Sequence, residues 1–201
     1  GYTTGSCATA ASKAAATMLL TGERVETVRI DTPKGIVLDL EPLDVEMTPE
    51  YVSCAIRKDS GDDPDDTNGV LVYARAERTD GSGIELEGGV GDGRMTKPGL
   101  ACAVGGPAIN PTPRRMITQE VGKAMEAAGY NGGMKLTISI PAGVEIAKKT
   151  FNPRLGIIGG LSVLGTSGIV EPMSEKALIE TMYVEIRAQK ARGNKNLLVF
   201  F

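Results

Sequence analysis

The start of the chain combines hydroxyl side chains, a thiol and the beginning of a predicted helix. Residues 1–7 read Gly-Tyr-Thr-Thr-Gly-Ser-Cys and run into an alanine-rich segment that predicts a helix over residues 8–20. Free N–H groups at a helix start, together with threonine and serine hydroxyls, are typical of an anion-binding site. A cysteine in such a place, here Cys7, can also serve as a nucleophile. An ordinary capped helix with a buried cysteine explains the same residues, so both interpretations stay open.

Carboxylates crowd into one predicted turn that follows a strand. Residues 58–67 read Lys-Asp-Ser-Gly-Asp-Asp-Pro-Asp-Asp-Thr. The turn could hold a divalent cation, although it lacks the ligand spacing of an EF-hand. It could instead accept hydrogen bonds from ribose hydroxyls or face a cationic ligand, and a solvated turn is the plain alternative. Because crowded like charges repel one another, the pattern slightly favours a partner.

Two glycine-rich segments and a pair of arginines are the next candidates. Residues 88–99 contain a partial G-x-G pattern, but without a clear strand before it or a helix after it they predict nucleotide binding only weakly. Residues 156–168 allow close backbone approach to a flat or phosphorylated ligand, or form a tight loop under a sheet. Arg114 and Arg115 are predicted in the first turn of a helix, where cations oppose the dipole. They either face an anion or form salt bridges.

The composition restricts which chemistry these residues can do. The chain has 201 residues, a net charge of −3, no histidine and 3 cysteines. Histidine is the commonest general base, and its absence also excludes Ser-His nucleophile pairs and most zinc sites. The absence of a basic stripe with interleaved aromatics argues against a nucleic-acid partner. Widely spaced cysteines favour a reduced, cytoplasmic protein, and no apolar run approaches the roughly 20 residues of a membrane span.

Short strands and a few helices must position the candidates. We predict strands at 27–30, 36–40, 52–57, 70–78, 135–140 and 145–150, helices at 8–20, 114–128 and 174–193, and a loop-like stretch at 80–113. This order predicts an α+β fold, with a two-layer sheet-and-helix domain over residues 1–155 and the start of an α/β portion over residues 156–201. Residues 196–201 read as a buried strand. Because bare apolar strands aggregate, we expect the α/β portion to continue beyond Phe201.

Four segments, in this order, resemble the CbiD family, the cobalt-precorrin-5B C1-methyltransferases of anaerobic cobalamin (vitamin B12) biosynthesis. They are GYTTGSCATAA at 1–11, KDSGDDPD at 58–65, TKPGL with AINPTPRRMI between 96 and 117, and TFNPRLGIIGGLSVLGTSGIVEPMS at 150–174. The resemblance implies transfer of the methyl group of S-adenosyl-L-methionine to C1 of a cobalt-containing tetrapyrrole, giving cobalt-precorrin-6A. Direct displacement by a preformed nucleophile needs alignment more than an acid–base pair, so the lack of histidine is compatible with it.

The resemblance also suggests which residues meet the substrate and the methyl donor. The tetrapyrrole carries many carboxylates, which cations, hydroxyls and helix starts bind; the candidates are Thr3, Thr4, Ser6, Lys97, Arg114, Arg115 and Arg154. A carboxylate suits the donor's sulfonium, and glycines allow close approach; the candidates are Asp59, Asp62, Asp63, Asp65, Gly159, Gly160, Gly165 and Thr166. We assign no catalytic residue and no metal ligand, and homo-oligomerisation stays open.

Two other classes of protein compete with the methyltransferase. One is an ATP-dependent small-molecule kinase, or another phosphate-binding protein of α+β fold, that uses residues 88–99 on a nucleotide. It predicts binding of ATP with magnesium and no affinity for the methyl donor. The other is a non-catalytic assembly subunit, which would bind neither.

Overall fold

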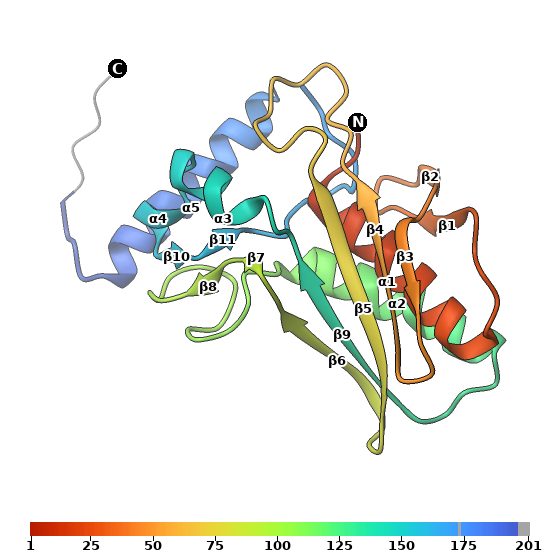
Figure 1. The fold of residues 1–201 in the computed structure, drawn as a ribbon. Helices are drawn as coiled ribbons and strands as arrows, with labels where there is room; N and C mark the ends of the chain where they lie inside the picture. Colours follow the sequence, from red (N-terminus) through yellow and green to blue (C-terminus); the bar gives the residue numbers. More distant parts are fainter. Residues whose placement is uncertain (173, 197–201) are drawn as a thin grey trace.

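A mixed sheet forms the centre of the computed structural model, which describes residues 1–172 and 174–196 (Figure 1). Its strands follow the order β3-β4-β5-β9-β6, and only the β6–β9 pair is parallel. The strands are β3 (Leu43–Met47), β4 (Tyr51–Arg57), β5 (Leu71–Thr79), β6 (Gly83–Gly88) and β9 (Gly133–Ser139). Alternate residues of β5 and β9 are fully buried, among them Val72, Ala74 and Ile138. The sheet therefore has one face in the core and one more polar face.

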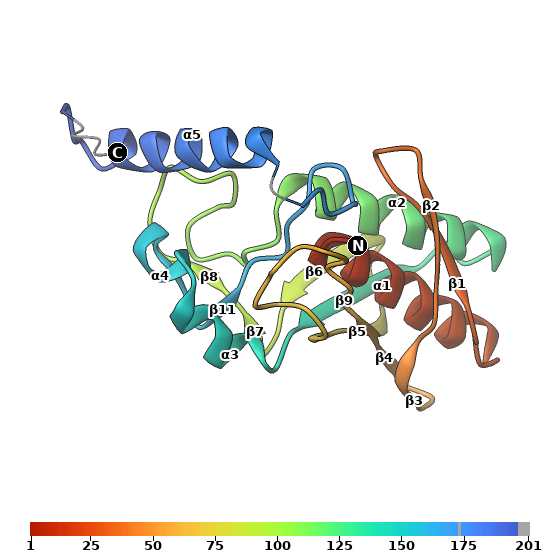
Figure 2. The same ribbon diagram turned by 90° about the horizontal axis from the view of Figure 1, so that it is seen from above.

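Helices α1 (Thr4–Thr21) and α2 (Pro111–Ala127) lie side by side on the buried face of the sheet (Figures 1 and 2). Most residues of α1 are buried, and its many alanines allow both the sheet and α2 to approach its backbone closely. The Thr3 hydroxyl caps α1 by accepting from the Ser6 N–H, and Gly22 ends it in the left-handed conformation with φ 72°. The predicted helix is thus confirmed, although it begins four residues earlier, at Thr4.

Short strands and helices flank this two-layer body. The hairpin of β1 (Val28–Asp31) and β2 (Val37–Leu40) packs against α1. At the opposite end, β11 (Gly160–Leu161) pairs in parallel with β7 (Gly91–Asp92), and β10 (Ile157–Ile158) pairs antiparallel with β8 (Arg94–Met95). The helices here are α3 (Gly143–Ile146), the 3-10 turn η1 (Ala147–Lys149), α4 (Asn152–Leu155) and α5 (Glu175–Ala191).

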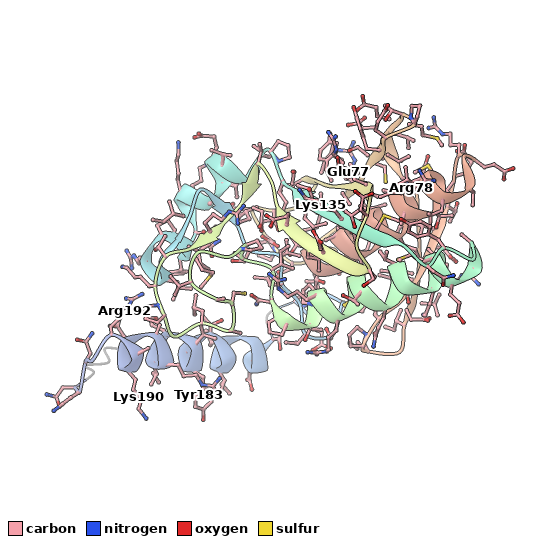
Figure 3. All side chains as sticks on the ribbon, turned by 90° about the horizontal axis from the view of Figure 1, so that it is seen from below. Glu77, Arg78, Lys135, Tyr183, Lys190 and Arg192 are labelled. Carbon is pink, nitrogen blue, oxygen red and sulfur yellow. The ribbon has the colours of Figure 1, made fainter. Side chains whose placement is uncertain are left out.

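Helix α5 extends past the sheet layer and meets the rest of the chain along one side (Figures 2 and 3). Tyr183 and Lys190 lie on its outer side, whereas Arg192 lies on the inner side and donates to the Arg154 carbonyl at 3.0 Å (Figure 3). Within the described residues, we found no helix with the length and hydropathy needed to cross a membrane.

The α+β class is confirmed, but several predicted elements are wrong. Residues 145–150 form helical turns rather than a strand, because the Pro-Ala-Gly turn after β9 leads into helix-forming residues. Residues 80–113 contain β6, β7, β8 and the start of α2, which the many glycines obscured. Strand β3 was not predicted. The strand predicted at 196–201 lies, apart from Asn196, outside the described residues, and the boundary at residue 156 stays a prediction.

Candidate functional site

Residues 160–168, within the fourth sequence motif, contact the first and third motifs directly. Gly160 and Leu161 pair with β7, and Val163 exchanges backbone hydrogen bonds of 2.9 Å with the segment just before α2. The Leu164 carbonyl accepts from the Gly5 N–H at 2.9 Å, and the Gly168 carbonyl accepts from the Thr3 N–H at 3.1 Å. The acidic turn joins through Tyr2, whose N–H donates to the Asp59 carbonyl at 2.8 Å. Segments far apart in the sequence therefore meet at one junction, which we take as the candidate site.

The hydroxyls at the start of α1 hold this junction together. The Ser6 hydroxyl donates to the Gly168 carbonyl at 2.7 Å. The Thr4 hydroxyl oxygen accepts from the Leu164 N–H at 3.0 Å and lies 3.3 Å from the Ser162 carbonyl oxygen. Together with the cap made by Thr3, these bonds occupy the donors that an anion would use. Substrate binding by Thr3, Thr4 and Ser6 stays a prediction, and it would require these bonds to be exchanged.

Cys7 does not suit nucleophilic chemistry. Its side chain is fully buried, and burial raises the pKa of the thiol to about 12, with Lys58 lowering it less. Because the thiolate is the reactive form, this cysteine is inert at neutral pH. The burial supports the interpretation of a buried cysteine in a capped helix rather than that of a nucleophile.

The acidic turn divides its carboxylates between structure and solvent. The buried Lys58 ammonium donates to Asp65 at 2.8 Å and to the Ser60 hydroxyl. Burial opposes ionisation of Asp65, but hydrogen bonds from Lys58 and Thr67 outweigh it and hold the pKa of Asp65 below its ordinary value. Asp59 and Asp62 are exposed, and Asp63 is half-buried. Within the described residues, no group of three acidic or cysteine side chains gathers in a way that could hold a metal ion.

The glycines of residues 156–168 mostly allow segments of this chain to cross each other. A Cβ on Gly160 would lie 2.1 Å from the Gly91 carbonyl oxygen, and one on Gly165 would lie 2.4 Å from the Thr3 hydroxyl oxygen. Gly159, with φ 86°, faces open space, and Thr166 is exposed. The space beside Gly160 and Gly165 is therefore filled by protein. The residues predicted for the methyl donor do not form a pocket by themselves, and their role stays a prediction.

The predicted cations fall into two groups. Lys97 and Arg154 lie at α4: the Lys97 side chain covers Gly156, and the Arg154 guanidinium lies 5.6 Å from the centre of the Phe151 ring. Arg114 and Arg115 lie in α2, which begins at Pro111 rather than at the predicted residue 114. Proline lacks an N–H, and the Arg114 N–H donates to the Asn110 carbonyl, so this helix end offers few backbone donors to an anion.

The two neighbouring arginines face different surroundings. Arg114 is half-buried, and its Nε donates to the Ile109 carbonyl at 2.8 Å. Arg115 is exposed, and its Nη2 donates to the Thr112 hydroxyl at 2.9 Å. Arg115 also lines a cleft of about 370 Å³ between α2 and the β1–β2 hairpin. A second cleft, of about 450 Å³, lies at the end of α1 and is mainly apolar. Neither of these clefts is lined by a residue predicted for the methyl donor.

Asp92 is a candidate that the sequence did not single out. Its side chain in β7 is only 4% exposed, and neither carboxylate oxygen has a hydrogen-bond partner. Burial raises the pKa of Asp92 to about 7, although Arg94 and Arg114 lower it. Buried acids with such pKa values are enriched at functional sites. In the sequence, the feature that could have pointed to Asp92 is its position between two glycines, Gly91 and Gly93, within the glycine-rich segment.

The fold and the site define an α+β protein in which residues 160–168 connect the starts of two helices through backbone hydrogen bonds. The family model described as CbiD matches residues 1–172, and the chain belongs to the CbiD family. The cobalt-precorrin-5B C(1)-methyltransferase of Thermoanaerobacter sp. (strain X514) is 55% identical over 198 residues, which are 98% of this chain and 53% of that protein. The protein of the same name from Ruminiclostridium cellulolyticum is 55% identical over 199 residues, 99% of this chain and 52% of that protein.

A solved structure is also similar. The crystal structure of the cobalamin biosynthesis protein (cbiD) from Archaeoglobus fulgidus matches with a TM-score of 0.65 and 35% identity, over 92% of this chain and 58% of that chain. The chain thus spans about half the length of the curated relatives it matches.

Proposed function

We propose that the chain acts in the methylation of C1 of cobalt-precorrin-5B, giving cobalt-precorrin-6A, with S-adenosyl-L-methionine as the methyl donor. The observation that carries this proposal is that residues 160–168 contact the first and third family motifs directly, while the acidic turn joins them through Tyr2. Relatives with 55% identity that are named for this reaction support it. The reaction belongs to anaerobic cobalamin biosynthesis, and we place it in the cytoplasm.

The proposed chemistry asks little of side chains as acids or bases. The donor supplies a methyl group on a positively charged sulfur; the electron-rich C1 forms the new carbon–carbon bond, and the electrons of the broken bond stay on sulfur. The protein has to align the two reactants and stabilise their charges. This suits a chain without histidine whose fully buried Cys7 stays protonated.

Within this proposal, the cations hold the carboxylates of the tetrapyrrole. Lys97, Arg154 and Arg115 are exposed and have no carboxylate partner within the described residues, so their charges are available. Asp59 and Asp62 are exposed carboxylates that suit the positive charge of the donor. Asp65 is a poorer candidate, because it already neutralises Lys58.

The test uses a chimera in which this chain replaces the matching half of the Thermoanaerobacter relative. Calorimetric titration of the chimera with S-adenosylhomocysteine, the demethylated donor, is expected to show saturable binding. Titration with ATP and magnesium is expected to show none. Binding of ATP without binding of S-adenosylhomocysteine would favour the kinase and refute the methyltransferase, and binding of neither would favour an assembly subunit.

A further inference from the structure

The cleft beside α2 has polar walls and lies next to the candidate site. Its volume is about 370 Å³, and it is lined by Asp31, Thr32, Pro33, Thr112, Arg115, Met116, Gln119, Glu120 and Lys123. Two contacts tie its hairpin wall to residues 160–168. The Lys34 backbone N–H donates to the Ser167 carbonyl at 3.0 Å. Gly168 packs closely on Thr32, because a Cβ added to Gly168 would lie 2.9 Å from the Thr32 Cβ. The junction of the motifs therefore positions one wall of the cleft.

Most of the charge in the cleft is already paired. Glu120 is only 3% exposed, and its carboxylate accepts from Lys13 at 2.6 Å and from Lys123 at 2.5 Å. Lys123 also donates to Asp31 at 2.8 Å. The two acids and two lysines form an alternating row whose charges cancel. The buried acid at the base of the cleft thus has its partners, and it does not need Arg115.

Arg115 is a cation in this cleft that forms no ion pair within the described residues. Within residues 1–172 and 174–196 it has no carboxylate partner, and its only hydrogen bond goes to the Thr112 hydroxyl. Its place near the start of α2 opposes the helix dipole, so the fold alone gives no reason for a cation here. Gln119, one turn later on the same wall, is exposed, and its side chain makes no hydrogen bond in the described part of the chain. A guanidinium, an amide and a hydroxyl thus border one cleft with donor capacity to spare.

We propose that this cleft binds a carboxylate-bearing side chain of the tetrapyrrole through Arg115, Gln119 and the Thr112 hydroxyl. The inference rests on the proposed function, which supplies a substrate with many carboxylates on short flexible arms. Arg115 contributes a forked, charge-assisted hydrogen bond, and the two neutral side chains fix the orientation of the carboxylate. Lys123 adds little while Asp31 and Glu120 neutralise it.

The test measures binding of two porphyrins to the 201-residue chain by quenching of porphyrin fluorescence. The probes are uroporphyrin I, an octacarboxylate, and coproporphyrin I, a tetracarboxylate. Uroporphyrin I is expected to bind more tightly, and Arg115→Gln is expected to weaken its binding about tenfold or more, the effect of losing a hydrogen bond to a charged group. Asp31→Asn, which frees the exposed Lys123, is expected to tighten binding about twofold. Arg24→Gln removes the same charge at an exposed site outside the cleft and is expected to change nothing.

Nuclear magnetic resonance locates the contact. Addition of uroporphyrin I to ¹⁵N-labelled chain is expected to shift the amide signals of Thr112, Arg115 and Gln119 in the wild type. At the same uroporphyrin concentration, the signals of Thr112 and Gln119 are expected to shift less in Arg115→Gln. The inference is overturned if uroporphyrin I does not bind, if Arg115→Gln and Arg24→Gln bind like the wild type, or if both weaken binding equally. If the chimera methylates its substrate while Arg115→Gln binds normally, only the cleft is refuted. If the chain binds uroporphyrin I through the cleft but the chimera transfers no methyl group, the cleft stands and the proposed function fails.

Discussion

The sheet with α1 and α2 is held together differently from the region of β7, β8, β10 and β11. The first has a large apolar core that runs from Ala8 and Met18 in α1 to Ile138 in β9. In the second, Leu161 of β11 joins that core, and a separate small cluster of Met95, Ala108 and Ile157 adds to two-residue strand pairs and glycine crossings. The candidate site joins the two regions, because residues 160–168 run from β11 to the starts of α1 and α2. The second region depends more on backbone hydrogen bonds than on apolar packing. Such a region is expected to open locally at lower free energy than the core.

Deleting one buried side chain from each region is the strongest test of this contrast. Ile138→Ala leaves a cavity in the centre of the sheet, where Ile138 is fully buried, and is expected to cost about 3–4 kcal/mol of unfolding free energy. Ile157→Ala, in the small cluster, is expected to cost about 2 kcal/mol or less, because its neighbours can collapse more easily. Urea denaturation followed by circular dichroism measures both. Equal costs would mean that the second region is packed as firmly as the first.

Two neighbouring glycines test whether segment crossing holds the second region. Gly160→Ala places a methyl group 2.1 Å from the Gly91 carbonyl oxygen, so β7 and β11 must separate, at an expected cost of about 2–3 kcal/mol. Gly159→Ala meets no atom within 4 Å and is strained only by its φ of 86°, at an expected cost of about 1 kcal/mol. Hydrogen exchange at Gly93, whose N–H donates to Leu161, is expected to accelerate more in the first variant. Similar exchange rates at Gly93 in both variants would show that the close approach of β7 and β11 at Gly160 is not what holds this region together.

The effect predicted for Asp92 depends on pH. Its pKa of about 7 in the folded chain lies above the ordinary value of 3.8, so the folded state binds more protons between these values. The stabilising contribution of Asp92 is therefore full below about pH 4 and is lost as the pH rises through about 7. Asp92→Asn cannot ionise, and its advantage over the wild type is expected to grow by about 2–3 kcal/mol between about pH 5 and pH 8. Thermal melts at both pH values measure this difference.

The control for Asp92 is Asp65→Asn. The hydrogen bonds of Asp65 hold its pKa below the ordinary value, so its contribution is present above about pH 4 and is lost as the pH falls further. The effect of Asp65→Asn on stability is therefore expected to be the same at pH 5 and at pH 8. If Asp92→Asn shows no pH-dependent advantage, the carboxylate has partners in solution and is not a buried, uncompensated acid.

The first region was predictable to a large extent, and the second was not. Alanine-rich residues 8–20 and the alternating apolar residues of 70–78 carry enough local signal to fix a helix and a strand. The pairs β7–β11 and β8–β10 have two residues in each strand, so no periodicity exists for a sequence pattern to show. Their pairing depends on contacts between residues some 65 positions apart, which local propensity does not encode.

The site residues divide in the same way. The sequence named the cations and the hydroxyls because their side-chain chemistry is visible without coordinates. It missed Asp92, because burial without a partner is a property of the packed chain. It could not separate Arg114 from Arg115, since the first residue of α2 decides which one faces the cleft. It also assigned to ligand binding the glycines at 160 and 165, whose space the chain itself fills.

The most direct test of the proposed function is methyl transfer by the chimera. It is incubated with cobalt-precorrin-5B and S-adenosylmethionine labelled with ¹³C in its methyl group, and the tetrapyrrole is then analysed by nuclear magnetic resonance. We predict one new labelled methyl signal that correlates with C1. A folded chimera that binds the tetrapyrrole yet leaves it unlabelled, while the intact Thermoanaerobacter relative labels it, would contradict the proposed function.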